Sequence, residues 1–89
     1  MAYYSITYDL IKSKDYAKIR EGIKSLSNDI WAKPTLSQWI IQSDKSVVQV
    51  RDYLKNYMDN DDILFVIEVK ENTWASWNIP KDVSAWLNK

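Results

Sequence analysis

Asp9 is the residue of this chain best placed to do chemistry. It stands near the end of Ala2–Leu10, AYYSITYDL, where alternate side chains would fall on opposite faces of a β-strand. A carboxylate at the end of a strand is suited to holding Mg²⁺ or Mn²⁺, because these hard cations prefer oxygen ligands. The competing interpretation is structural, since an aspartate in this position often caps the following turn by accepting hydrogen bonds from backbone amides.

The residue types that the chain lacks restrict the chemistry further. The sequence contains no cysteine and no histidine, which excludes disulfides, thiolate nucleophiles, cysteine-based zinc sites and the commonest general base. Catalysis must then rest on carboxylates, hydroxyls or lysines together with Mg²⁺ or Mn²⁺. For Asp9, the second carboxylate would come from the same residue of another subunit, so that a homodimer holds one ion between two aspartates.

Two further groups of side chains are candidates for binding nucleic acid. Basic residues gather near the start of the first expected helix, where they would either contact phosphates or form a solvated face. Aromatic residues on the strands would either stack on bases or pack in the core and in an interface. The binding residues predicted from these groups are Tyr8, Lys12, Lys14, Arg20 and Trp39.

A short acidic turn forms another cluster of carboxylates. It contains Asp59, Asp61 and Asp62, and this number of carboxylates could hold calcium. The turn lacks both the glycine and the distal glutamate of an EF-hand loop. We therefore expect a solvated turn here rather than a calcium site.

Length and charge describe a small neutral domain. Twelve basic residues balance twelve acidic ones, which removes the overall positive field of a dedicated nucleic-acid binder. The 89 residues should form one domain, 1–89, that is marginal alone and gains from an oligomeric contact. Five tryptophans and six tyrosines exceed what such a core needs, so some should line an interface or a ligand surface. Without a long apolar stretch or a leader pattern, the expected location is the cytoplasm, away from membranes.

Hydrophobic spacing predicts a helix after the first strand. Apolar side chains recur every three or four residues over Tyr16–Leu26, and Ser13 or Asp15 is the expected N-cap. Gly22, the only glycine of the chain, lies inside this helix, where it costs about 1 kcal/mol relative to alanine. A close approach to the sheet would explain it, and a tolerated defect is the alternative.

The middle of the chain has the pattern of two strands and a second helix. A proline separates the short strands 30–33 and 36–42, and the second of these carries large apolar side chains on both faces. The helix is expected over 45–58, where Ser46 and Gln49 have the spacing of a capping box.

The end of the chain supplies a last strand and a tail. The apolar run ILFVIEV, 63–69, is typical of a buried strand, and the tail 70–89 holds three tryptophans that must pack on its own sheet or on a second subunit. The resulting βαββαβ order predicts a ferredoxin-like α+β sandwich, with two helices on one face of four antiparallel strands. We expect the open face to meet a second copy across a two-fold axis.

Several short segments resemble a family of small ferredoxin-like proteins. They are Ser5–Leu10 SITYDL, Ser37–Ile41 SQWII and Asp61–Ile67 DDILFVI. In this order, within 2–69, they are similar to the small CRISPR-associated adaptation protein with proposed endonuclease activity, and the virulence-associated D-type ribonuclease toxins share the plan. The tail segment Val83–Leu87, VSAWL, resembles the end of small bacterial and phage proteins of the same outline.

The resemblance implies a homodimer in which the aspartate ending the first strand, here Asp9, is the catalytic residue and the ligand of Mg²⁺ or Mn²⁺. The implied function is that of a nucleic-acid-associated protein, either a metal-dependent endoribonuclease or a catalytically inactive relative. The alternative is a non-enzymatic binding module of phage or mobile-element type, which sequesters a partner protein or a small nucleotide through its aromatic-rich surface.

Overall fold

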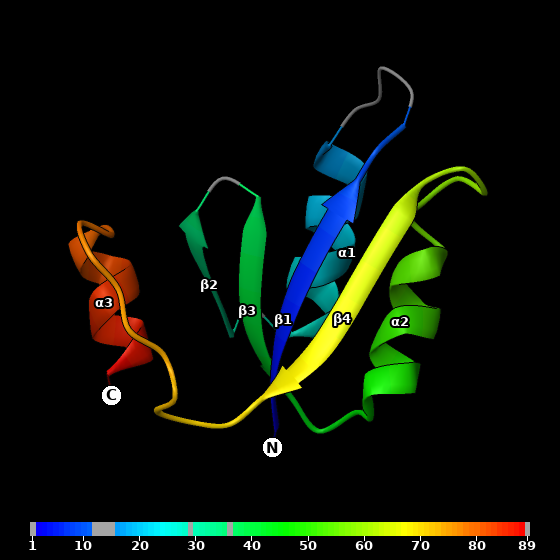
Figure 1. Ribbon diagram of the computed structural model, residues 1–89. Helices are drawn as coiled ribbons and strands as arrows, with labels where there is room; N and C mark the ends of the chain where they lie inside the picture. The colour runs from blue at the N-terminus through cyan, green and yellow to red at the C-terminus, as the bar shows by residue number, and fades with distance from the viewer. Residues whose placement is uncertain (1, 12–15, 29, 36, 89) are drawn as a thin grey trace.

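The computed structural model describes residues 2–11, 16–28, 30–35 and 37–88. It confirms the α+β class, with a four-stranded antiparallel sheet and three helices (Figure 1). In chain order the elements are β1 Ala2–Asp9, α1 Ala17–Leu26, β2 Trp31–Thr35, β3 Gln38–Ser43, α2 Val47–Lys55, β4 Ile63–Val69 and α3 Lys81–Leu87. Within these ranges, no helix combines the length and the apolar character needed to cross a membrane.

The strand order in the sheet is β2-β3-β1-β4, and every neighbouring pair is antiparallel. Each of the helices α1 and α2 therefore joins two strands that have another strand between them. β1 lies inside the sheet, where Ile6 stands opposite Trp39 of β3 and Val66 of β4. This arrangement is compatible with a ferredoxin-like sandwich.

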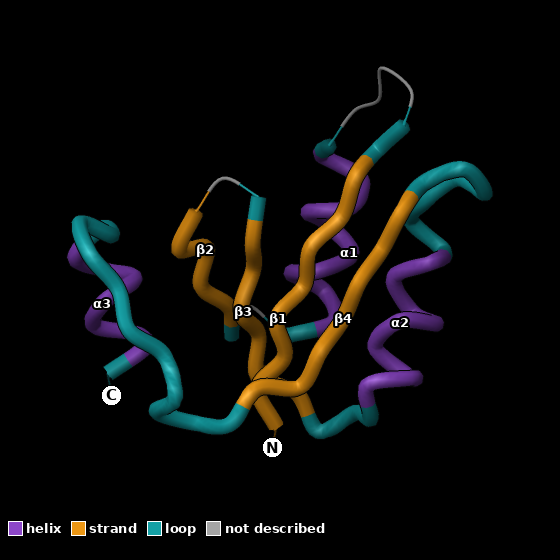
Figure 2. The backbone as a smooth tube through the Cα atoms, viewed as in Figure 1, coloured by secondary structure: helices purple, strands orange, loops and turns teal. Residues whose placement is uncertain are grey.

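The main core lies between the sheet and the helices α1 and α2, which cover one face (Figure 2). It forms because alternate strand residues and one stripe of each helix are apolar. The expected capping box starts α2, since the Gln49 N–H donates to Ser46 Oγ at 3.1 Å and the Ser46 N–H to Gln49 Oε1 at 2.8 Å. The buried core residues are Tyr4, Ile6, Ile19, Ile23, Leu26, Trp39, Ile41, Val50 and Leu54.

The tail packs on the opposite face of its own sheet. This is one of the two alternatives expected for its tryptophans, the other being a second subunit. Tyr3 of β1 contacts Trp74 and Trp86 edge-on, with ring centroids 5.4 and 6.0 Å apart. α3 lies against β2. This second core consists of Ala32, Ile40, Val83 and Leu87, with Tyr3, Trp74, Ile79 and Trp86 packed against it.

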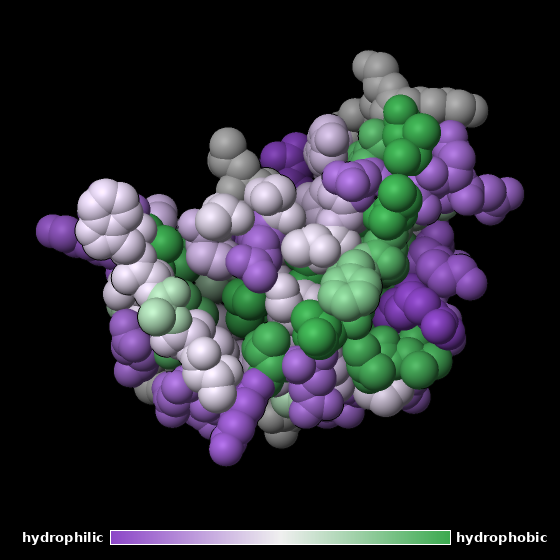
Figure 3. Space-filling view, in the orientation of Figure 1, coloured by the Kyte–Doolittle hydropathy of each residue, from purple (hydrophilic) through white to green (hydrophobic). Residues whose placement is uncertain are grey.

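The prediction of a buried last strand is wrong. β4 lies at an edge of the sheet, and its side chains alternate between the two faces. Leu64 and Val66 are half-buried against the helices, whereas Ile63, Phe65 and Ile67 are 54, 59 and 48% exposed. The reason is that the second core covers the β2 side of the open face and leaves the β4 side to solvent. A band of hydrophobic atoms follows this edge in Figure 3.

α1 differs from the expectation in two details. Its N-cap position is Tyr16, which makes no side-chain cap hydrogen bond, while the expected caps Ser13 and Asp15 lie outside the described residues. Gly22 does mark a close approach, but to the segment after α2 and not to the sheet. A Cβ atom added to Gly22 would lie 2.6 Å from Cδ1 of Tyr57. The glycine therefore lets α1 and the end of α2 approach each other.

The boundaries of two other elements also shift. β2 continues through Pro34 to Thr35, with an irregular register between Ala32 and Thr35. Proline is tolerated there because β2 is the other edge strand of the sheet. α2 ends at Lys55, one turn earlier than its hydrophobic spacing predicts.

Candidate functional site

Asp9 lies at the exposed end of β1. The sheet register places it opposite Ile63, the first residue of β4. The backbone N–H of Ile11, which follows the strand, donates to Oδ1 of Asp62 at 3.2 Å. Among the described residues, the Ile11 amide that follows this strand end is thus capped by Asp62.

The acidic turn before β4 brings several carboxylates together. The ligand oxygens of Asp59, Asp61 and Asp62 lie within 4.8 Å of one another, a spacing at which three oxygens could hold a hard cation. Asp62 also has a structural role, because its Oδ2 accepts the Asp59 N–H at 2.8 Å while its Oδ1 accepts the Ile11 N–H. It thereby ties the loop after β1 to the turn before β4.

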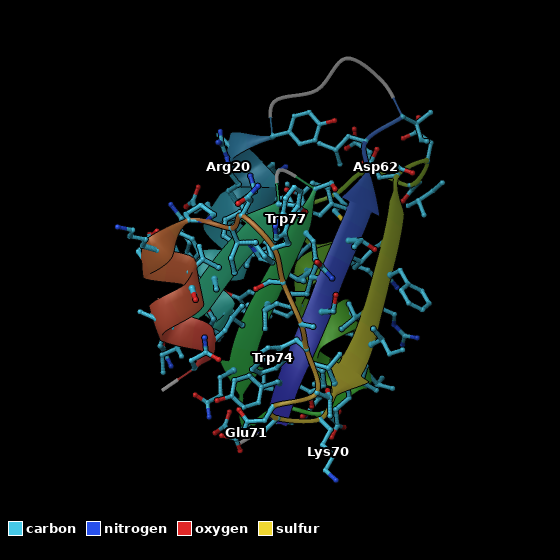
Figure 4. All side chains as sticks on the ribbon, turned by 60° about the vertical axis from the view of Figure 1, so that its left-hand side comes forward. Arg20, Asp62, Lys70, Glu71, Trp74 and Trp77 are labelled. Carbon is cyan, nitrogen blue, oxygen red and sulfur yellow. The ribbon has the colours of Figure 1, made fainter. Side chains whose placement is uncertain are left out.

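Positive charges lie close to this acidic turn. A hollow of about 290 Å³ is lined by Arg51 and Lys55 of α2 together with Asp59 and Asp62. These cations oppose the binding of a metal ion by partly cancelling the field of the carboxylates. Asp9 is not a member of the acidic cluster, although it lies at the same end of the sheet, where Figure 4 labels Asp62.

The predicted phosphate-binding residues form no continuous basic surface over the described part of the chain. Lys12 and Lys14 lie outside the described residues. Arg20 is exposed on α1, where it borders a shallow hollow of about 480 Å³ together with Glu21 and Lys24. The mixed charge of this surface weakens its attraction for a polyanion.

Trp39 lies in the core, so the prediction that it binds a base is not met by its position. It is 1% exposed, its Nε1–H donates to the Tyr8 hydroxyl at 3.1 Å, and its ring centroid lies 4.9 Å from that of Trp31. No face of the ring is open to a base. Tyr8 is half-buried, with its ring centroid 6.0 Å from that of Tyr16. The core-packing interpretation therefore describes Trp39.

Several tyrosines have shifted pKa values for structural reasons. Burial, and then the charge of Glu68, raises the pKa of Tyr4. The Tyr53 hydroxyl lies 2.9 Å from Ser25 Oγ and 3.3 Å from the Tyr57 hydroxyl. Its hydrogen bonds to Ser25 and then to Tyr57 lower the pKa of Tyr53, whereas the bond to Tyr53 raises the pKa of Tyr57. The hydrogen bonds among Ser25, Tyr53 and Tyr57 thus link α1 to α2 and to the segment that follows α2.

A pocket of about 340 Å³ lies between the tail and the open face of the sheet. We call it the tail pocket. β1, β3 and β4 supply its floor, and the segment after β4 supplies a wall in which Trp74 lies (Figure 4). Its lining residues are Ser5, Pro34, Gln38, Ile40, Ile67, Val69, Thr73, Trp74, Ala75, Ser76 and Leu87.

The tail pocket is neutral and mainly apolar. The described residues that line it include no charged side chain. Gln38 Nε2 donates to Ser5 Oγ at 2.7 Å, which leaves one amide N–H and the carbonyl oxygen of Gln38 for a ligand. Trp74 adds an aromatic wall that Tyr3 holds by an edge-on contact. The volume falls at the lower end of the range for small-molecule sites, which suits a single ring system.

The tail pocket could not be predicted from the sequence. Period-two alternation places Ser5 on the face opposite the helices, and the strand register then brings it beside Ile40 and near Gln38. The tail could be predicted to pack on something because of its tryptophans. Which half of the sheet it would cover depends on contacts between distant segments, and no local pattern carries that information.

The comparisons with known proteins assign no family. No family model, no curated protein and no solved structure matches this chain.

Proposed function

We propose that this protein is a non-enzymatic binding module with a ferredoxin-like fold that acts as a homodimer. Its ligand is a neutral planar ring of the nucleobase type, held in the tail pocket. Two features support this class of ligand: the aromatic wall of Trp74 and the unused donor and acceptor of Gln38. A glutamine amide can bind the edge of a base through one donor and one acceptor.

The observation that carries the proposal is the neutrality of the tail pocket. A site for the phosphates of a nucleotide would need cations, and the described lining has none. The base or nucleoside portion of a nucleotide is therefore the part that fits. An added phosphate should leave the affinity unchanged or reduce it.

Calorimetry with adenosine, other nucleosides and the corresponding monophosphates tests the proposal. We expect at least one nucleoside to bind, and Trp74→Ala to weaken it by about 1–3 kcal/mol, the value of stacking one base on an aromatic ring. Trp77→Ala is the matched control, because Trp77 is 86% exposed and does not line the pocket. Gln38→Leu should also weaken binding while keeping the size of the side chain.

Two results would contradict the proposal. One is the absence of heat for every nucleoside with a folded parent protein. The other is equal weakening by Trp74→Ala and Trp77→Ala, which would place the ligand elsewhere. Circular dichroism of each variant shows that a loss of binding does not come from unfolding.

Metal-dependent cleavage of nucleic acid is a second candidate, in line with the resemblance to the adaptation-protein family. It is favoured by one observation: Asp9 and the acidic turn lie at the same end of the sheet, since Asp9 opposes Ile63 and Asp62 accepts the Ile11 N–H. Further carboxylates for Mg²⁺ or Mn²⁺ then lie in the same subunit. Under this proposal Asp9 and Asp61 act as ligands.

Incubation with RNA and DNA in Mn²⁺ tests this candidate. Asp9→Asn and Asp61→Asn should each abolish Mn²⁺-dependent cleavage if the proposal is right. Asp44→Asn is the control, because Asp44 is exposed and follows β3 at the opposite end of the sheet. Cleavage by Asp9→Asn at the parent rate, or no cleavage by any form, would rule this activity out.

A further inference from the structure

We infer that the free edge of β4 pairs with the β4 of a second copy of this chain, antiparallel and centred on Val66. The inference rests on the homodimer of the proposed function and gives that dimer its interface. Two sheets joined in this way would form one continuous eight-stranded sheet, with the helices of both copies on the same face.

The first observation is the exposed apolar edge itself. β4 pairs with β1 on one side and forms the edge of the sheet on the other. Ile63, Phe65 and Ile67, which we call the apolar stripe, are about half exposed along this edge (Figure 3). Natural proteins normally protect a long apolar edge strand with charge, proline or a covering segment, because its free backbone groups invite pairing.

The second observation is that the sequence of β4 suits pairing with itself. A two-fold axis perpendicular to the sheet keeps equivalent faces together, and centring it on Val66 pairs the whole strand Ile63–Val69. Phe65 of each copy then stands opposite Ile67 of the other. Pairs of an aromatic and a β-branched side chain are among the favourable cross-strand pairs.

Charge complementarity supports this register. Glu68, the only charged residue of β4, lies on the helical face, where it would stand opposite Leu64 of the second copy. Leu64 borders a groove of about 250 Å³ that Arg51 also lines. Each Glu68 carboxylate would thus approach Arg51 of the other copy. Arg51 pairs with Asp52 at 2.9 Å, but both side chains are more than half exposed, so this contact is readily exchanged.

The size of the interface sets its expected strength. The apolar stripe exposes on the order of 300 Å² per copy, well below the roughly 800 Å² that each partner buries in a stable interface. The groove beside Val47 and Val48 would add to the buried area. We therefore expect a reversible dimer that forms in the micromolar range and dissociates on dilution.

Sedimentation equilibrium of the full chain over a range of concentrations tests the inference. Phe65→Lys should give a folded monomer, because Phe65 is 59% exposed and lies outside the core. Glu68→Arg and Arg51→Glu should each weaken the dimer, by roughly tenfold or more. The double variant Glu68→Arg/Arg51→Glu should recover most of the parent affinity. Glu71→Arg, exposed beyond the end of β4, is the control and should dimerise normally.

The possible results distinguish a wrong β4 interface from a wrong homodimer. A dimer that is insensitive to Phe65→Lys and to the charge reversals overturns the β4 interface and leaves the homodimer intact. A parent protein that is monomeric at all concentrations overturns both. Nucleoside calorimetry on the Phe65→Lys monomer tests the tail pocket independently of the dimer, because nucleoside binding by the monomer would support the pocket whatever the state of association.

Discussion

Replacing Gly22 with alanine tests the contact on which the helix layer depends. The added Cβ would lie 2.6 Å from Cδ1, 2.7 Å from Cγ and 3.0 Å from Cε1 of Tyr57. The two nearest of these atoms, Cγ and Cδ1, belong to the end of the ring closest to the backbone, so a small rotation of the side chain does not clear them. Either Tyr57 leaves its position beside Tyr53 or α1 moves away from the end of α2.

The sign of the effect follows from two opposing terms. Alanine favours the helix over glycine by about 1 kcal/mol. Overpacking of a well-filled contact costs about 1–3 kcal/mol. The expected net change is a loss of up to about 2 kcal/mol in the free energy of unfolding, and in a domain of this size each kcal/mol lowers Tm by about 4–8 °C.

Urea denaturation followed by circular dichroism measures the change, and a double-mutant cycle identifies its cause. In a Tyr57→Ala background the clash is absent, so Gly22→Ala should stabilise the protein by about 1 kcal/mol. Lys18→Ala, at an exposed position of α1, should change stability little. If Gly22→Ala were stabilising in the parent protein as well, the close approach of Gly22 and Tyr57 would be wrong.

Substitutions at three further positions test other parts of the fold. Ser46→Ala removes the capping box of α2 and should cost about 1 kcal/mol in urea denaturation, while Ser46→Asp should retain most of it; equal losses would argue against the cap. Trp39→Phe removes the indole donor to Tyr8 and leaves a void, so it should cost about 1–3 kcal/mol, and a neutral effect would contradict its burial. Burial raises the pKa of Tyr4 above its ordinary value of 10.0. The stability that Tyr4 contributes is therefore fully present below pH 10, and it falls as the pH rises above 10. Tyr4→Phe should therefore lose less stability than the parent between pH 9 and pH 11, and an identical alkaline loss would refute this.

Local patterns predicted most of the individual elements. Period-two alternation identified β1, and the spacing of Ser46 and Gln49 identified the start of α2, because both signals depend on neighbouring residues alone. The α+β class followed from the order of the elements. β2 was placed within a few residues, but it was expected to end before Pro34, which its edge position tolerates.

Long-range contacts decided what the sequence could not predict. The apolar run of β4 was expected to be buried, but burial depends on which half of the sheet the tail covers. For the same reason the tail pocket was missed, because its walls come from segments far apart in the chain. Asp9 was correctly placed at the end of a strand, whereas the role of Asp62 beside Ile11 depends on a contact between two loops.

The indole N–H signals of the tryptophans provide the most direct test of the tail pocket. In a nucleoside titration followed by ¹H–¹⁵N NMR, we expect the indole signal of Trp74 to shift with the ligand, because Trp74 lines the pocket. The signals of Trp39, buried on the helical face, and of Trp77, exposed on the tail, should stay in place. A shift of Trp77 or Trp39 without one of Trp74, or no shift of any indole signal at saturating nucleoside, would contradict binding in the tail pocket.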